Sequence, residues 1–407
     1  MRRHVVIVGA GPAASSCVAE LRRYGFGGQV TVIGDEPSAP YDRTLLSKEF
    51  LDGAVTEQDL LLDPAGLYGE LDVELRLGVR ATRLMAGERR VVLSDGASVA
   101  FSELVIATGG AARVPPPLAA DGVVALRTIA DARRLRETLR RCSHLAIVGG
   151  GFIAGEVATA ARAQDKQVTM LEAAEAPMAR LVGAQVGRRL EALHRAAGVD
   201  VLCGAEARRI DRVSGGYRIA VRDGRVIEAD AVVVAVGMKP AVDWLVGVSG
   251  IELADGVITD PLCRTGVPDV LAVGDCARWL HATYGRAVRV EHWDIALRHG
   301  AAAARTITGS AEPFVPVPFV WSVQHGSRLQ WVGEPGPWHQ VEIDDLEAPT
   351  GMVARYYSGA SLRAVFAINA PRAVAMARRT FEQEDVAAGG DLLWSSAAPG
   401  GLRAPQR

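Results

Sequence analysis

The sequence predicts an α/β fold with two Rossmann-like dinucleotide-binding domains and a smaller C-terminal α+β domain. The main evidence is a pair of similar segments: the apolar run 5–8 leads into residues 9–14 (GAGPAA), and the apolar run 145–148 leads into residues 149–154 (GGGFIA). Each segment reads as a buried strand, a G-x-G-x-x-A turn and a helix, the unit that seats a dinucleotide pyrophosphate on a helix N-terminus. Because each unit opens one half of the chain, we expect two bound nucleotides.

The glycines of these turns carry the chemistry of the motif. The backbone turns sharply there, and a phosphate must approach where a Cβ would otherwise lie. For either segment alone, a tight strand-to-helix turn without a ligand is the alternative interpretation. The presence of both in one chain favours nucleotide binding.

The first segment continues as a doubly wound sheet would. Residues 29–33 (QVTVI) form the second predicted strand, which ends at Gly34, Asp35 and Glu36. A carboxylate at this place binds an adenosine ribose, because both ribose hydroxyls can donate to it; the alternative for Asp35 is a turn. Residues 73–104 predict short strands, residues 104–109 (LVIATG) close the unit, and residues 114–117 (VPPP) indicate a linker.

The second segment repeats this order. It opens with a helical, arginine-rich stretch at 131–141, which is either a solvated face or a partner-docking face. Residues 167–172 form a strand that ends in Glu172, near the spacing of about 20 residues after Gly149 expected for a ribose carboxylate. No lysine or arginine in 173–176 could meet a 2′-phosphate, and an acid repels one, so NADH is preferred over NADPH. Residues 231–237 (AVVVAVG) mirror the earlier closure.

The remaining chain returns to the first unit and then changes character. Residues 269–275 predict a buried strand that ends in Asp275, and a helix is expected from about Asp294 to Thr308. Residues 313–407 show strand-like alternation and several tryptophans, with a loose tail after about Gly389. We therefore predict a first nucleotide domain from 1–113 and 244–312, a second from 114–243, and a C-terminal domain from 313–407.

Composition narrows the class of protein. The 407 residues carry a formal net charge of −2, which argues against a nucleic-acid partner. The apolar run at 5–8 is too short for a signal-peptide core and leads into a glycine turn. No stretch reaches the length of a membrane helix, so no membrane association is expected. The five cysteines contain no C-x-x-C pair, which fits a reducing cytoplasm and excludes the usual local redox dithiol. Only Lys48, Lys166 and Lys239 are lysine.

The motifs together resemble a known family of flavoenzymes. They include VGAG at 8–11, IGDE at 33–36, PYDR at 40–43 followed by LSK at 46–48, ATG at 107–109, GGGFI at 149–153 with Glu156, VGDCA at 273–277, EHW at 291–293, and WS at 321–322. This set is similar to the FAD-dependent pyridine-nucleotide oxidoreductases, and within them to the NADH-dependent ferredoxin reductases of oxygenase systems, the putidaredoxin-reductase and biphenyl-dioxygenase-reductase type. The resemblance covers nearly the whole chain.

The resemblance implies that the first domain holds FAD and the second NAD. The implied FAD-binding residues are Gly9, Gly11, Ala13, Ala14, Asp35, Glu36, Arg43, Lys48, Ala81, Arg127, Asp275 and Trp293. The implied NAD-binding residues are Gly149, Gly151, Phe152, Ile153, Glu172 and Gly237. Among them, Arg43 and Arg127 would neutralise phosphates and Asp275 would accept from the ribityl chain. A surface arginine is the alternative for Arg127. No metal site is expected.

Two residues carry the implied chemistry. In the family, the lysine that matches Lys48 lies beside flavin N5 and pairs with the glutamate that matches Glu156. An ammonium there favours electron density on the isoalloxazine, and Glu156 keeps the lysine charged and placed. The helix that begins near Trp293 would point its N-terminus at the pyrimidine end of the flavin. A surface lysine and an ordinary helix acid are the alternatives.

The sequence departs from the family at three places. Thr44 and Leu45 replace a Pro-Pro pair, Ala154 replaces a glycine, and Val323 replaces an aspartate. The last change removes a carboxylate near the flavin edge, which bears on partner choice or proton handling.

The expected function is electron transfer from NADH through FAD to a small [2Fe–2S] ferredoxin that serves an oxygenase such as a cytochrome P450 or a ring-hydroxylating dioxygenase. We expect a monomer or weak homodimer. One alternative is an NADH oxidase, a peroxide-reducing enzyme or a disulfide reductase, but these need a redox cysteine beside the flavin. A flavoprotein resembling apoptosis-inducing factor is another, and a rubredoxin is the nearest alternative acceptor.

Overall fold

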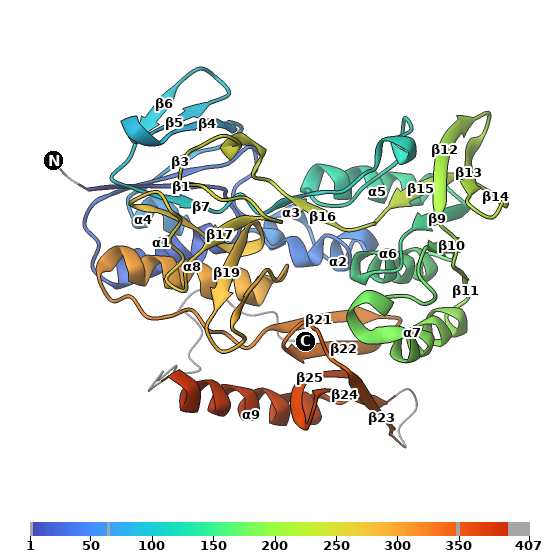
Figure 1. Cartoon of the computed structure of the whole chain (residues 1–407). Helices are drawn as coiled ribbons and strands as arrows, with labels where there is room; N and C mark the ends of the chain where they lie inside the picture. Colours follow the sequence, from blue (N-terminus) through green and yellow to red (C-terminus); the bar gives the residue numbers. More distant parts are fainter. Residues whose placement is uncertain (1–2, 63–65, 347–350, 390–407) are drawn as a thin grey trace.

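The structure is a computed structural model, and it describes residues 3–62, 66–346 and 351–389 (Figure 1). The predicted tail after about Gly389 therefore lies outside the described residues. The described part folds into two parallel sheets with their own helices, joined to an antiparallel C-terminal sheet. This arrangement confirms the predicted fold class.

The first sheet has the strand order β18-β7-β1-β2-β3, and all its neighbours are parallel. Its strands are β1 (His4–Val8), β2 (Gln29–Ile33), β3 (Val73–Arg76), β7 (Glu103–Ile106) and β18 (Val270–Ala272). Alternating side chains fill two cores. Val5 and Ile7 pack under α1 (Pro12–Arg23) and α8 (Trp293–Thr308), whereas Val6 and Val8 pack on the small sheet β4 (Ala81–Met85), β5 (Arg90–Leu93) and β6 (Ser98–Ala100).

The second sheet repeats this plan with the order β11-β10-β9-β15, again all parallel. Its strands are β9 (His144–Val148), β10 (Gln167–Glu172), β11 (Val199–Cys203) and β15 (Ala231–Val234). One face is covered by α5 (Ile129–Arg141) and α6 (Phe152–Ala163), and the other by β12 (Ala207–Val213), β13 (Gly216–Val221) and β14 (Val226–Ala229). The short strands β8 (Gly110–Ala112) and β16 (Met238–Pro240) pair where the chain passes between the two units.

The segment that carries Lys48 leaves the first unit and lies against the second. It contains η1 (Arg43–Leu45), α2 (Glu49–Asp52) and α3 (Glu57–Leu60). Leu46, Phe50 and Leu51 are buried in the same core as side chains of α5 and α6. Hydrophobic burial therefore holds Lys48 next to the helix that follows the second glycine loop.

The C-terminal sheet is antiparallel, with the order β21-β22-β25-β24-β23. Its strands are β21 (Phe319–Gln324), β22 (Ser327–Gly333), β23 (Gln340–Asp345), β24 (Met352–Ser358) and β25 (Ser361–Ile368). One face packs on α7 (Ala179–Ala196) of the second unit, and the other is covered by α9 (Pro371–Gly389). Figure 1 shows this sheet and α9 below the two parallel units.

The remaining elements are short. They are α4 (Leu67–Glu70), η2 (Ala86–Glu88), η3 (Pro116–Leu118), η4 (Asp243–Leu245), β17 (Val257–Thr259), η5 (Gly274–Cys276), β19 (Ala277–His281) and β20 (Arg286–Val288). Within the described ranges, no helix is both long and apolar enough to cross a membrane. The domain limits predicted above remain our proposed division of the chain.

The helices after the glycine turns begin earlier than the sequence indicated. We expected α1 from Ser15 and α6 from about Gly155, whereas they start at Pro12 and Phe152. Gly11 and Gly151 are the N-cap residues, so the helix starts directly after the last glycine of each turn. The predicted order of strand, turn and helix is unchanged.

Candidate functional site

The two glycine loops have nearly the same backbone. Gly9 has a φ of +117° and Gly149 a φ of +113°, a region that residues with a Cβ rarely adopt. A Cβ on Gly9 would collide with the carbonyl oxygen of Ala107, and a Cβ on Gly149 with that of Ala235. Both glycines are therefore required by the local packing of the turn itself.

The other glycine of each loop has a different reason. A Cβ on Gly11 or Gly151 would meet no atom within 4 Å. No side chain caps the helix that either residue starts, so first-turn N–H groups are available to an anion. Each loop thus leaves an open cradle at a helix N-terminus, which fits a pyrophosphate.

Around the first loop, the predicted ribose and phosphate residues form a cluster. The Arg43 guanidinium lies 2.5 Å from a Glu36 carboxylate oxygen, and the Tyr41 hydroxyl donates to the other at 2.7 Å. Asp35 is largely exposed, 3.7 Å from Arg80. Glu36 is therefore the more strongly placed of the two predicted carboxylates. Ala81 is buried in β4 and pairs with Leu93.

Arg127 and Asp275 come from distant parts of the sequence and form an ion pair of 2.9 Å. Arg127 also donates to the carbonyl oxygen of Gly110 at 2.9 Å, beside the closing strand of the first unit. Neither partner is fully buried, so both side chains remain accessible from the site. The pair lies at the edge of the first sheet, since Asp275 follows β18.

The first residue of α8 carries a buried hydrogen-bond donor that a bound cofactor could satisfy. The indole N–H of Trp293 is buried and has no hydrogen-bond partner in the described part of the chain. A buried donor without a partner is rare and indicates a missing acceptor. Ala13 and Ala14 are buried under the same helix. These observations fit a bound flavin in the first unit.

The second loop carries its own carboxylate. The Glu172 side chain lies against Gly150, where a Cβ would approach it to 2.7 Å, and it accepts from the Ala174 N–H at 2.7 Å. Ile153 is 40% exposed at the start of α6, whereas Phe152 packs toward the C-terminal sheet. Gly237, with a φ of +101°, follows the last strand of the second sheet.

Lys48 and Glu156 lie together, as the resemblance implied. The Lys48 ammonium is 3.0 Å from a Glu156 carboxylate oxygen and donates to the Thr44 carbonyl oxygen at 3.1 Å. The Glu156 side chain is only 4% exposed and the Lys48 side chain 19%. A buried carboxylate needs such a partner, so the two side chains hold each other in place.

Sequence reasoning assigned no role to three polar side chains at this pair. The Ser47 hydroxyl donates to one Glu156 oxygen at 2.5 Å, and the Ser322 hydroxyl donates to the other at 2.6 Å. The Gln324 amide donates to the Ser322 oxygen at 3.1 Å. The signal in the sequence was the strand alternation of β21, which turns Ser322 and Gln324 to one side and Val323 to the other.

His292 lies near Lys48, and its ring packs edge-on against the ring of Trp321, with the two centroids 4.2 Å apart. Burial, and then the Lys48 ammonium, lower the pKa of His292 to about 3, so its ring is neutral near pH 7. Its ring nitrogens lie 3.3 Å from the backbone N–H groups of Asp294 and Trp321. A neutral imidazole accepts at one nitrogen only, so it satisfies one of these donors at a time. Burial also raises the pKa of Asp294 to about 6.

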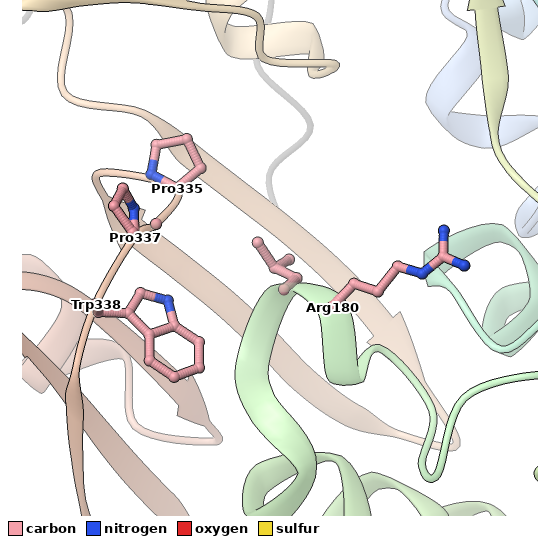
Figure 2. A pocket seen from close by; sticks show the side chains of 6 residues that line it. Arg180, Pro335, Pro337 and Trp338 are labelled. Atoms are coloured by element: carbon pink, nitrogen blue, oxygen red, sulfur yellow. The ribbon is translucent and has the colours of Figure 1, made fainter.

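A cavity of about 260 Å³ lies where α7 meets the loop after β22. Figure 2 shows Pro335, Pro337 and Trp338 on one side and Arg180 on the other, with its guanidinium directed away from them. The backbone N–H of Met178, just before α7, donates to the Gly150 carbonyl oxygen at 3.1 Å. The residue just before α7, the helix that lines one side of the cavity, is therefore hydrogen-bonded to the second glycine loop.

Residues 3–300 match the family model described as pyridine nucleotide-disulphide oxidoreductase, and residues 319–393 match the model of the reductase C-terminal domain. The first match spans well over half of the chain. This chain belongs to the pyridine nucleotide-disulphide oxidoreductase family. Members of this family are flavoprotein oxidoreductases, and the chain accordingly uses FAD and NAD(H).

Individual relatives place it more closely within the family. It is 35% identical over 388 residues to the benzene 1,2-dioxygenase system ferredoxin–NAD(+) reductase subunit of Pseudomonas putida, covering 94% of this chain and 93% of that one. It is 37% identical over 333 residues to the 5,5′-dehydrodivanillate O-demethylase ferredoxin reductase subunit of a Sphingobium strain, covering 81% of each. The solved structure of the covalent putidaredoxin reductase–putidaredoxin complex matches with a TM-score of 0.88 at 29% identity, over 93% of this chain and 92% of that one.

The burial and pKa values of the cysteines distinguish this chain from family members that use a redox cysteine. All five thiols are unpaired. Cys17 is fully buried in α1, and burial raises its pKa to about 12. Cys276 is also fully buried, and burial raises its pKa. Neither thiol has the accessible, acidic character of a redox cysteine.

Proposed function

We propose that this enzyme takes hydride from NADH and passes single electrons to a [2Fe–2S] ferredoxin that serves an oxygenase. The observation that carries the proposal is the ion pair between the half-buried ammonium of Lys48 and the buried carboxylate of Glu156, on the helix that follows the second glycine loop. This ion pair links Lys48 of the first nucleotide domain to Glu156 of the second. The relatives that are ferredoxin reductase components of oxygenase systems support the acceptor class.

The residues that would hold FAD are those of the first loop, with Glu36 at the ribose, Arg43 and Arg127 near the phosphates and Asp275 at the ribityl chain. When bound, FAD accepts a hydride and releases its electrons one at a time. The indole N–H of Trp293 and the N-terminus of α8 present positive ends to this site. They stabilise negative charge that arrives there.

NADH would bind along the second loop. The open space over Gly151 admits the pyrophosphate, and Glu172 accepts from the ribose hydroxyls. The same carboxylate repels a 2′-phosphate, which makes NADPH the poorer substrate. The Lys48 ammonium is held in place by the buried carboxylate of Glu156 beside it.

A disulfide reductase or a thiol-dependent oxidase or peroxidase is the rival class. Such an enzyme needs a reactive thiol at the flavin, whereas the thiols of Cys17 and Cys276 are buried and have raised pKa values. A rubredoxin remains the alternative one-electron acceptor. The five unpaired thiols also support a cytoplasmic location, and we propose a monomer or weak homodimer.

Anaerobic stopped-flow mixing with NADH, NADPH and then a ferredoxin tests this proposal. We expect rapid bleaching by NADH, slow bleaching by NADPH, and little oxygen consumption until the iron–sulfur protein is added. Rapid peroxide consumption that a thiol reagent abolishes would favour the rival class.

The variant Lys48→Ala tests the central residue. Loss of a preorganised charge at the reacting centre should slow flavin reduction on the order of 10²-fold. Lys239→Ala is the matched control, because Lys239 is an exposed lysine paired with Asp243. Near-normal reduction of Lys48→Ala would remove this lysine from the mechanism.

A further inference from the structure

The carboxylate of Glu156 receives hydrogen bonds from two domains besides its own. Ser47 and Lys48 come from the segment before α2, Glu156 from α6 of the second unit, and Ser322 from β21 of the C-terminal sheet. Ser47, Glu156 and Ser322 are 2%, 4% and 0% exposed. Water therefore cannot replace a lost partner at low cost.

Ser322 and Lys48 share the same oxygen of Glu156, Oε1. The hydroxyl approaches it to 2.6 Å and the ammonium to 3.0 Å, while Ser47 holds Oε2. With both oxygens held, the carboxylate cannot rotate about its terminal bond. Removal of the Ser322 hydroxyl would leave Oε1 to the ammonium alone, so the carboxylate and the ammonium could shift together about the remaining contact with Ser47.

Gln324 determines the direction of the Ser322 hydroxyl. Its amide donates to the Ser322 oxygen at 3.1 Å and lies 3.4 Å from the Phe152 carbonyl oxygen. Because Ser322 accepts from Gln324, its own hydrogen is directed to Glu156. Gly155 makes room for this arrangement, since a Cβ there would collide with the Gln324 amide.

Val323 lies on the opposite face of β21 and is 41% exposed. It is thus adjacent in sequence to both positioning side chains without lying in their network. A substitution there changes the same strand but not the Glu156 contacts, which makes it a matched control.

We propose that Ser322 and Gln324 are positioning residues for the Lys48 ammonium, so that the C-terminal sheet completes the hydride-accepting site. The inference deepens the proposed function and rests on it. It assigns to the third domain a part in the reductive step, carried through the Glu156 carboxylate.

The composition of the chain offers a direct test. Labelling with ¹³C at lysine Cε marks three positions, because the chain has only Lys48, Lys166 and Lys239 as lysines. A carbon–proton correlation spectrum therefore shows one signal for each of them. In Ser322→Ala we expect the Lys48 signal to move while the other two remain in place. Val323→Ala should move none of them, and Ser322→Thr, which keeps the hydroxyl, should return the Lys48 signal toward its original position.

Stopped-flow reduction by NADH provides the second readout. We expect the limiting reduction rate of Ser322→Ala to fall about tenfold, as for loss of a hydrogen bond to a charged group, with the NADH concentration at half-saturation unchanged. Ser322→Thr should recover most of the rate. Gln324→Met, which keeps the side-chain volume, serves as the second variant and should shift the Lys48 signal and the rate in the same direction.

An unmoved Lys48 signal with a normal reduction rate in both Ser322→Ala and Gln324→Met would overturn the inference. A large change in half-saturation without a change in limiting rate would also overturn it, because it would indicate a general effect on coenzyme binding. Failure of the proposed function looks different: the wild-type protein itself would not bleach with NADH, whatever the lysine signals do.

Discussion

The two glycine loops of this molecule have similar backbone angles at their first and last glycines but differ in what covers the helix that follows. In both, the first glycine has a strongly positive φ and is pressed against a carbonyl oxygen, and the last glycine faces open space. Beyond these residues the similarity ends. The helix turn that follows the first loop is covered by α8, whereas the helix turn that follows the second loop is partly exposed.

The cover of the first loop comes from α8. A Cβ on Gly300 of α8 would collide with the carbonyl oxygen of Ala13 in α1, so α1 and α8 are in backbone contact. Ala13 is 5% and Ala14 0% exposed. At the second loop the equivalent residues are Ile153, which is 40% exposed, and Ala154, which is 0% exposed. Phe152, the equivalent of Pro12, packs on the C-terminal sheet.

The carboxylates at the ends of the second strands differ in the same sense. Glu36 is held by the side chains of Arg43 and Tyr41, whereas Glu172 accepts from the backbone N–H of Ala174. A covered helix turn suits a cofactor that stays, and an exposed one suits a coenzyme that exchanges. The motif therefore determines that a dinucleotide binds, and its surroundings determine how long it stays.

The largest effect is expected from alanine at the strained glycines. Gly9→Ala and Gly149→Ala each combine an unfavourable φ with a backbone collision, at a cost of about 2–6 kcal/mol of folding free energy. Gly9→Ala should abolish FAD retention. Gly149→Ala should leave a yellow protein that no longer responds to NADH. FAD content per chain measures the first effect, and the absorbance change on NADH titration measures the second. Equal FAD loss in both variants would show that the two units do not fold separately.

Alanine at the open glycines should separate binding from folding. Gly11 and Gly151 have extended backbones, and a Cβ there meets no protein atom, so the unfolding temperature of the ligand-free protein should hardly change. The added methyl occupies the phosphate space instead. Affinity for FAD in Gly11→Ala, and for NADH in Gly151→Ala, should fall at least tenfold, the loss expected for a charge-assisted hydrogen bond. Unchanged affinities by calorimetry would contradict the cradle assignment.

The carboxylates sharpen the comparison further. Glu172→Gln should narrow the preference for NADH over NADPH about tenfold, because it removes the charge that repels a 2′-phosphate. Glu36→Gln should weaken FAD retention and leave the coenzyme preference unchanged. The ratio of the flavin reduction efficiency with NADH to that with NADPH measures the coenzyme preference, and FAD content per chain measures FAD retention. A changed ratio in Glu36→Gln would mean that the two carboxylates are not confined to separate sites.

A further effect, confined to acidic pH, concerns the buried imidazole of His299 on α8, which accepts from the backbone N–H of Gly274 at 3.2 Å. Burial lowers the pKa of His299 to about 3, so the folded state keeps it neutral while the unfolded chain protonates it near 6.5. Its contribution to stability is complete above pH 6.5 and is lost as the pH falls toward 3, by about 1.4 kcal/mol per pH unit. His299→Gln should therefore flatten the loss of stability between pH 6.5 and 4.5. Urea unfolding followed by FAD release measures the slope, and an unchanged slope would refute the assignment.

Much of the site was predictable because local sequence determines local geometry. A glycine at a positive φ, a carboxylate after a second strand and a helix after a glycine turn each depend on a few consecutive residues, and the predicted loops, strands and Glu172 lie in the order expected. The helix starts were predicted too late, since Gly11 and Gly151 serve as N-caps.

The sequence by itself determined the fold class, the two glycine loops and the pairing of Lys48 with Glu156 by resemblance. Only the tertiary structure decided which partners meet at Glu156, because Ser47 and Ser322 are separated from it by more than a hundred residues and no local pattern relates them. It also decided that Val323 faces away from the pair. Contacts of this kind arise from the packing of three domains, and they depend on surfaces that no single segment encodes.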